Sequence, residues 1–108
     1  MSRIVAVGGV WAYVCDVLYP VDADVATVFA LAEEDPLGLF EYLRPFVEEC
    51  AGEVESAEVK GVFFSPEAGL VAEFVARNSR GAVSAKLIYS QSPEKALATY
   101  YRRAGNRP

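Results

Sequence analysis

Two stretches decide the fold: residues 70–76, which read LVAEFVA, and residues 82–89, which read AVSAKLIY. The segment between them, Asn78-Ser79-Arg80-Gly81, is rich in turn-forming residues. A register that pairs Glu73 with Lys86 gathers the large apolar side chains on one face and an ion pair on the other. Its further pairs are Leu70 with Tyr89, Ala72 with Leu87, and Phe74 with Ala85. This agreement predicts an antiparallel hairpin.

A third strand is predicted over residues 57–64, joined to the second by the turn at residues 65–69. Pairing Lys60 with Glu73 extends the ion pair into a ladder of Lys60, Glu73 and Lys86. The ladder face also receives four apolar residues, which is more than a solvated face of a small monomer carries. They are Val62, Phe64, Val71 and Val75. Either a helix or a second copy of the chain must cover them, and we take the second copy as the predicted partner.

The remaining elements complete an α+β pattern. Residues 3–7 and 10–19 are rich in β-branched and aromatic residues and flank Gly8-Gly9, which predicts a hairpin. Helices are predicted from the cap Asp22 to Asp35 and from Pro36 to about Ala51, with a kink or break at Pro45 and a stop at Gly52. A last helix is predicted from Ser92-Pro93 to Gly105. The expected fold is one antiparallel five-stranded sheet, with a mixed sheet as the alternative, in the order ββααβββα, with the helices mainly on one face.

Length and composition indicate a single globular domain over residues 1–108, since 53% of the residues are apolar. No apolar run approaches the ~20 residues that cross a bilayer, and the first residues do not resemble a secretory signal. The chain is therefore expected to lie in the cytoplasm and not to associate with a membrane. A pI near 4.7 disfavours general attraction to nucleic acid or to anionic lipid.

Charge is separated along this acidic chain. Residues 1–60 contain twelve acidic and three basic residues, a net charge of −9, whereas residues 61–108 contain three acidic and seven basic residues, a net charge of +4. The two sums give the overall −5. Such a molecule can pair with a copy of itself, or present an acidic and a basic face to different partners.

The two cysteines, Cys15 and Cys50, lack the close spacing of a metal site. The sequence favours two buried apolar thiols, and a disulfide between them is the alternative. An intracellular disulfide is ordinary in hyperthermophiles. The small number of thermolabile amides, namely Asn78, Gln91 and Asn106, also suits a thermophilic source.

Catalytic and cofactor motifs are missing from the sequence. The chain has no histidine, which removes histidine-based catalysis and histidine metal sites. Gly8-Gly9 lacks the context of a phosphate-binding loop, so no cofactor and no enzyme activity are expected. The best basic patch is Arg102, Arg103 and Arg107 beside two tyrosines; packing of the tyrosines and capping of the helix is the preferred interpretation.

Two family resemblances accompany these patterns. The order of strands, helices, three strands and helix from Val10 to Ala104 resembles the roadblock/light-chain-7 adaptor domains, although the usual first helix is missing and an extra helix follows the hairpin. The segment from Tyr19 to Gly52 resembles the strand–helix–helix opening of helix-grip ligand-binding domains, but too few strands follow it. Neither resemblance assigns a site residue.

The sequence thus favours a non-catalytic adaptor or assembly module that forms a homodimer and binds another protein of unspecified identity. The alternative is a small-molecule-binding domain with an apolar cavity between helices and sheet. Its expected lining is Phe29, Phe40, Leu43, Phe63 and Phe74.

Overall fold

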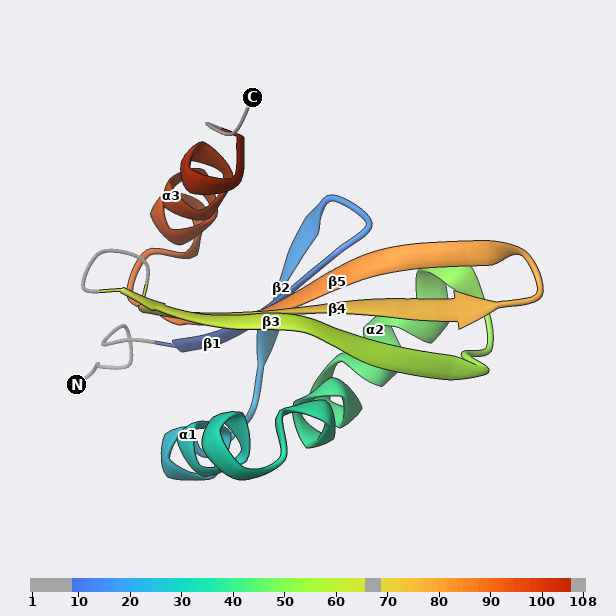
Figure 1. The fold of residues 1–108 in the computed structure, drawn as a ribbon, viewed down its shortest axis with the longest axis horizontal. Coiled ribbons are helices and arrows are strands. Elements are labelled where there is room, and N and C mark those ends of the chain that lie inside the picture. The colour runs from blue at the N-terminus through green and yellow to red at the C-terminus, as the bar shows by residue number, and fades with distance from the viewer. Residues whose placement is uncertain (1–8, 66–68, 106–108) are drawn as a thin grey trace.

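The structure, a computed structural model, describes residues 9–65 and 69–105 of the chain. Within these residues five strands form one antiparallel sheet in the order β2-β1-β5-β4-β3 (Figure 1). The strands are β1 (Gly9–Val14), β2 (Val17–Val21), β3 (Ser56–Ser65), β4 (Gly69–Asn78) and β5 (Gly81–Ser90). Between β2 and β3 lie α1 (Val25–Glu34), the 3-10 helix η1 (Pro36–Leu39) and α2 (Phe40–Ala51), and α3 (Pro93–Gly105) follows β5. The predicted α+β class and element order are confirmed.

The hairpin of β4 and β5 has the predicted register. Glu73 lies opposite Lys86, and the three other predicted pairs are also present: Leu70 with Tyr89, Ala72 with Leu87, and Phe74 with Ala85. This register is favoured because a slip of one strand by one residue would move its core residues, such as Leu70 and Phe74 of β4, out of the larger core.

The pairing of β3 with β4 departs from the predicted register at Lys60. Val59 lies opposite Phe74, which the pairing of Lys60 with Glu73 would also require, but Gly61 lies opposite Glu73, so Lys60 is the extra residue of a β-bulge. The predicted ladder through Lys60 is therefore wrong. The shift by one residue also exchanges the faces of the residues that follow, because side chains alternate along a strand.

The first hairpin of the described residues turns at Cys15-Asp16, inside the segment 10–19 that was predicted as one strand. Val14 pairs with Val17, and the two residues between them have φ of 52° and 65°. A two-residue hairpin turn with both φ positive has the twist that joins antiparallel strands well. The predicted strand at residues 3–7 and the residue Gly8 lie outside the described residues.

The helix ends follow capping chemistry. α1 begins after Asp24, whose carboxylate accepts a hydrogen bond of 3.0 Å from the backbone N–H of Thr27. The predicted cap at Asp22 is therefore wrong by two residues. α2 contains Pro45 and ends at Gly52, which adopts a φ of 91°, so the predicted glycine stop is confirmed.

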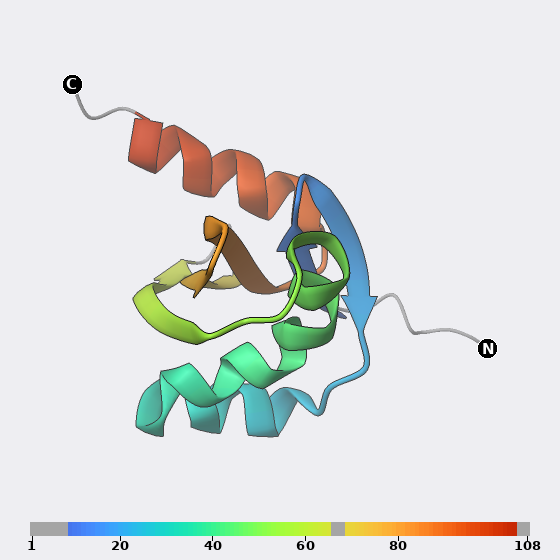
Figure 2. The same cartoon turned by 90° about the vertical axis from the view of Figure 1, so that its right-hand side faces the viewer.

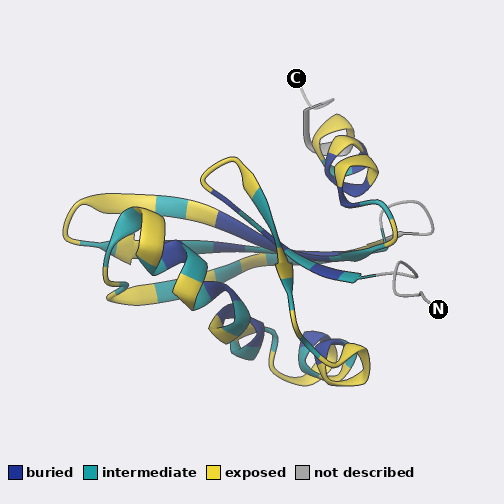
Figure 3. Cartoon of the chain, turned by 180° about the vertical axis from the view of Figure 1, so that it is seen from behind, coloured by how far each residue is buried: buried dark blue, intermediate teal, exposed yellow. Residues whose placement is uncertain are grey.

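Helices cover both faces of the sheet (Figure 2). α1, η1 and α2 lie on one face, where the larger core forms, and α3 lies over the other. The buried sides of α1 and α2 face the sheet in Figure 3. Buried residues of the larger core include Val28, Leu39, Phe40, Leu43 and Val47 from the helices and Leu70, Phe74 and Leu87 from the sheet. A smaller core beneath α3 contains Val71, Ile88, Ala96 and Leu97.

Candidate interaction surface

The four predicted interface residues do not share one surface. Val71 is 1% exposed because α3 covers it. Val62 packs against the larger core on the opposite face, since the bulge at Lys60 reversed its direction. Val75 is half-buried, and of the four only Phe64 is exposed. The common face expected from alternation alone is therefore wrong for Val62 and Phe64, and a helix covers Val71.

Two exposed phenylalanines define a different surface at the end of β3. Phe63 is 45% exposed and Phe64 is 54% exposed. The Phe63 ring lies 5.4 Å from the Tyr100 ring of α3, and the Phe64 ring lies 6.2 Å from the Phe29 ring of α1. The two rings thus flank the strand, one on each face of the sheet. We call Val62, Phe63 and Phe64 the β3 aromatic edge.

The backbone of β3 is open along this edge. β3 is the last strand in the sheet order, so within the described residues it pairs only with β4. It is ten residues long and contains no proline. The opposite outer strand, β2, has five residues and includes Pro20, which lacks the N–H that strand pairing needs. β3 is therefore the better edge for the addition of a strand.

A buried lysine lies beneath α3, next to the aromatic edge. The Lys86 side chain is 7% exposed, and its Nζ lies 3.9 Å from Oε2 of Glu73 and 3.3 Å from Oγ of Ser84. Three tyrosine rings surround this ammonium group at 5.3–5.8 Å from their centroids. They belong to Tyr13, Tyr100 and Tyr101, which we call the tyrosine cage. The Tyr100 hydroxyl also donates a hydrogen bond to Glu73 and so connects α3 to the ion pair.

Burial shifts the proton equilibria of this cluster. Desolvation lowers the pKa of Lys86, and the Glu73 carboxylate partly opposes that shift. Desolvation raises the pKa of Tyr100, and its hydrogen bond to Glu73 raises it further. Desolvation, followed by the neighbouring Tyr101, raises the pKa of Tyr13 to about 12. The cluster is thus stable with a neutral phenol at each of these two tyrosines.

These shifts predict a loss of stability in alkaline solution. An unfolded tyrosine ionises near 10.0, whereas folded Tyr13 and Tyr100 keep their protons to higher pH. Ionisation therefore favours the unfolded chain, and the free energy of unfolding falls as pH rises above 10.0. Lys86 acts in the opposite direction, because its folded pKa is lowered, but that effect is complete once pH exceeds the unfolded value of 10.5.

Denaturant unfolding at about pH 8 and about pH 11.5 measures this loss. Tyr100→Phe removes one of the two phenols, so it is expected to lose less stability over that interval than the wild type does. A wild-type free energy of unfolding that stays constant above pH 10 would contradict the assignment.

The structure places the other predicted site residues as follows. Cys15 and Cys50 form a disulfide, but both residues are exposed, so the predicted burial is wrong. The cause is their position, at a hairpin turn and in the last turn of a helix. Arg102 is exposed and Arg103 lies within α3, whereas Arg107 lies outside the described residues.

The five residues predicted to line a ligand cavity do not face one common space. Phe63 lies on the α3 side of the sheet, away from the larger core. Phe40 and Phe74 fill the space between α2 and the sheet, with ring centroids 5.8 Å apart and both side chains buried. A shallow hollow of about 220 Å³ lies elsewhere, beside the end of α2. It is lined by Ala51, Asn78, Arg80, Gly81, Ala82 and Val83.

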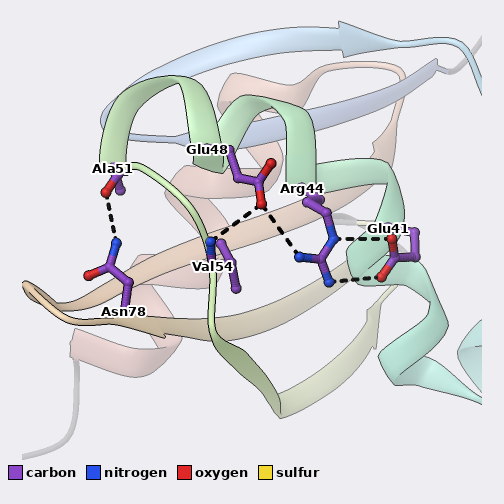
Figure 4. Close-up of polar contacts among 6 residues, drawn as sticks. All are labelled: Glu41, Arg44, Glu48, Ala51, Val54 and Asn78. Atoms are coloured by element: carbon purple, nitrogen blue, oxygen red, sulfur yellow. Dashed lines mark hydrogen bonds and ion pairs between the residues drawn. The ribbon is translucent and has the colours of Figure 1, made fainter.

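Polar side chains anchor the C-terminal half of α2 to the rest of the molecule (Figure 4). The Asn78 side-chain amide and the Arg80 guanidinium both donate to the carbonyl oxygen of Ala51, at 2.8 and 3.1 Å. Glu48 accepts from the backbone N–H of Val54 at 3.3 Å. These contacts satisfy helix-end groups and hold α2 against the β4–β5 turn.

Neither metal-ligating side chains nor comparisons with known proteins assign a function to the part of the chain that the structure describes. Among residues 9–65 and 69–105, no group of three metal-ligating side chains comes together. No helix of this part of the chain is long and apolar enough to cross a membrane. Comparisons with protein-family models, with curated proteins and with solved structures give no match in any of the three.

Proposed function

We propose that this protein is a non-catalytic interaction module that assembles with a second copy of itself through the β3 aromatic edge. The observation that carries the proposal is the pair of half-exposed phenylalanines, Phe63 and Phe64, on the two faces of a ten-residue strand whose outer edge has no partner among the described residues. Long edges with exposed apolar residues tend to pair with another strand, and monomeric proteins usually protect them. Aromatic residues are also enriched at the centres of protein interfaces.

A two-fold arrangement makes this edge complementary to itself. If the β3 strands of two copies pair antiparallel, the rings of Phe63 and Phe64 from both copies gather along one seam. Phe63 contributes on the α3 side, and Phe64 contributes beside α1. Main-chain hydrogen bonds between the two strands would then join the two sheets. This use of β3 replaces the assembly through the sheet face that alternation alone had suggested.

The proposal includes the cytoplasm as the location and a thermophilic organism as the source. The Cys15–Cys50 disulfide supports the second part, because intracellular disulfides are common in hyperthermophiles and rare in mesophiles. The acidic helical layer stays free in the proposed dimer and offers a surface for another protein. Residues 22–55, which span α1, η1 and α2, contain ten acidic residues and one basic residue.

Replacement of Phe64 by glutamate is expected to give a folded monomer. A carboxylate at this position would be buried against the partner's apolar seam, at a cost well above that of an exposed substitution. Light scattering or sedimentation of the wild type and Phe64→Glu at tens of micromolar, about 50 µM, measures the difference. Circular dichroism confirms that the variant is folded.

Val17→Glu provides a matched control. Val17 is 44% exposed, close to the 45% of Phe63, but it lies in β2, at the opposite edge of the sheet from β3. This variant should assemble as the wild type does. A wild-type protein that is monomeric at this concentration would overturn the proposed function, whereas a Phe64→Glu dimer would show that assembly uses another surface.

A further inference from the structure

The Cys15–Cys50 disulfide lies where a reductant can reach it. Both cysteines are exposed, one at the tip of the β1–β2 hairpin and the other in the last turn of α2. In Figure 3 the hairpin tip is coloured as exposed. Exposed disulfides are more easily reduced than the buried ones of structural cores, because the attacking thiolate needs access to sulfur.

This disulfide closes a loop that contains the whole helical layer apart from its last turn. The enclosed residues, 16–49, include β2, α1, η1 and most of α2. They contain nine acidic residues and one basic residue, a net charge of −8. Mutual repulsion among these charges opposes the packing of the layer. The cross-link counteracts that tendency by fixing both ends of the loop.

The turn residue Cys15 has no local reason to be a cysteine. Its φ of 52° falls in the left-handed region, where Asn, Asp and Gly are favoured and most other residues are strained. Asp16, with a φ of 65°, fits this preference. The cross-link to Cys50 therefore accounts for the residue better than the turn does.

The anchors of the layer differ between its middle and the end of α2. At this end of α2 they include the stacking of Phe46 on Tyr19, with ring centroids 4.7 Å apart, and the hydrogen bonds of Asn78 and Arg80 to Ala51. The buried side chains of α1 and α2 then hold the remainder. Loss of the cross-link would leave these contacts to resist both the repulsion and the restored chain entropy of the loop.

We propose that Cys15–Cys50 is a redox-sensitive latch that controls the docking of the α1–α2 layer on the sheet. A dithiol reductant is the co-reactant. Its thiolate attacks one cysteine sulfur, the protein S–S bond breaks and a mixed disulfide forms; the second thiol of the reductant then displaces the protein sulfur. Cys15 and Cys50 take up two electrons and two protons and become thiols, and the reductant becomes a disulfide.

If the protein assembles through the β3 aromatic edge, reduction of the disulfide also affects that assembly. Phe64 packs on Phe29 of α1, so loosening of the layer removes the support beneath one ring of the β3 aromatic edge. This consequence rests on the proposed function. The latch itself is tested by hydrogen exchange, whose outcome does not depend on whether the protein assembles.

Two measurements on the folded full-length chain test the latch. Dithiothreitol is expected to reduce the native protein within about tenfold of the rate for the guanidinium-unfolded chain, because both cysteines are exposed. In the reduced protein, amide protection in α1 and α2 should fall by about a hundredfold or more, while protection in β4 and β5 is retained. Reduction that proceeds only as fast as global unfolding would overturn the proposal.

The amide protection of the individual helices and strands distinguishes the remaining outcomes. An unchanged α1–α2 layer, or an equal loss in every element, would contradict a local latch. The double variant Cys15→Ser, Cys50→Ser should reproduce the reduced protein without any reductant. If that variant does not fold, amide hydrogen exchange measured on the wild-type protein, reduced while folded, still decides between the outcomes.

Discussion

Truncation of Phe74 to alanine is expected to lower the free energy of unfolding by about 3–5 kcal/mol. Phe74 is fully buried at the centre of the larger core, where its ring lies 5.8 Å from that of Phe40. Its removal forfeits the burial of a large side chain and leaves a cavity between α2 and the sheet that the surrounding elements can fill only in part. Denaturant unfolding monitored by circular dichroism measures the change.

Phe64→Ala is the matched control, because it removes the same side chain from a neighbouring strand. Phe64 is 54% exposed, so its truncation should cost about 1 kcal/mol or less in the monomer. The two variants must be compared at a concentration at which assembly does not contribute. Equal costs for the two truncations would show that Phe74 is not the central core residue that its burial indicates.

The strand registers could be predicted from the sequence only where no bulge interrupted the alternation of side chains between the two faces. In β4 and β5 the pairing of Glu73 with Lys86 also brought the larger apolar residues of one face together, so the register followed from the sequence. In β3 the same argument worked as far as Val59 and then was wrong, because Lys60 is the extra residue of a bulge. Gly61 was the available signal, since a glycine inside a strand often marks a bulge.

The single strand predicted at residues 10–19 was wrong for a different reason. Gly8-Gly9 is the stronger turn signal by local propensity, and Cys15-Asp16 has no glycine to accept positive φ. A long-range cross-link joins Cys15 of this turn to Cys50, and turn propensities do not include such contacts. The sequence left that disulfide open as the alternative, and it missed the exposure of both cysteines.

The covered face was missed because pattern alone does not assign a helix to a face. The spare apolar residues on the ladder face were recognised, and a helix was the stated rival to a second copy. In the structure α3 covers Val71 and Ile88. The tyrosine cage had a partial signal in Tyr100-Tyr101, but its third ring, Tyr13, comes from a strand far away in the sequence.

The ion pair beneath α3 leads to the second large effect. Glu73→Leu is expected to lower the free energy of unfolding by about 2–4 kcal/mol, because it leaves the Lys86 ammonium buried without its carboxylate. Glu73 keeps 24% of its side chain exposed, which places the expected cost below that of breaking a fully buried pair. The variant also removes the acceptor of the Tyr100 hydroxyl.

Deprotonation of Lys86 sets an upper limit on the stability that Glu73→Leu can lose. Near neutral pH an isolated buried lysine can become neutral, and the free energy of that step from an ordinary pKa is about 5 kcal/mol. The burial that already lowers the pKa of Lys86 reduces this figure further. Lys86→Met removes the buried cation but leaves the Glu73 carboxylate, which is 24% exposed and keeps the hydrogen bond from Tyr100, so this variant should cost less than Glu73→Leu.

A double-mutant cycle separates these contributions. The double variant Glu73→Leu, Lys86→Met should recover most of the stability that Glu73→Leu loses, since no unpaired charge remains beneath α3. Unfolding of the wild type, both single variants and the double variant at one pH near 7 gives the coupling free energy. If the two single losses simply add, the carboxylate does not compensate the buried charge, and α3 is held by its apolar contacts alone.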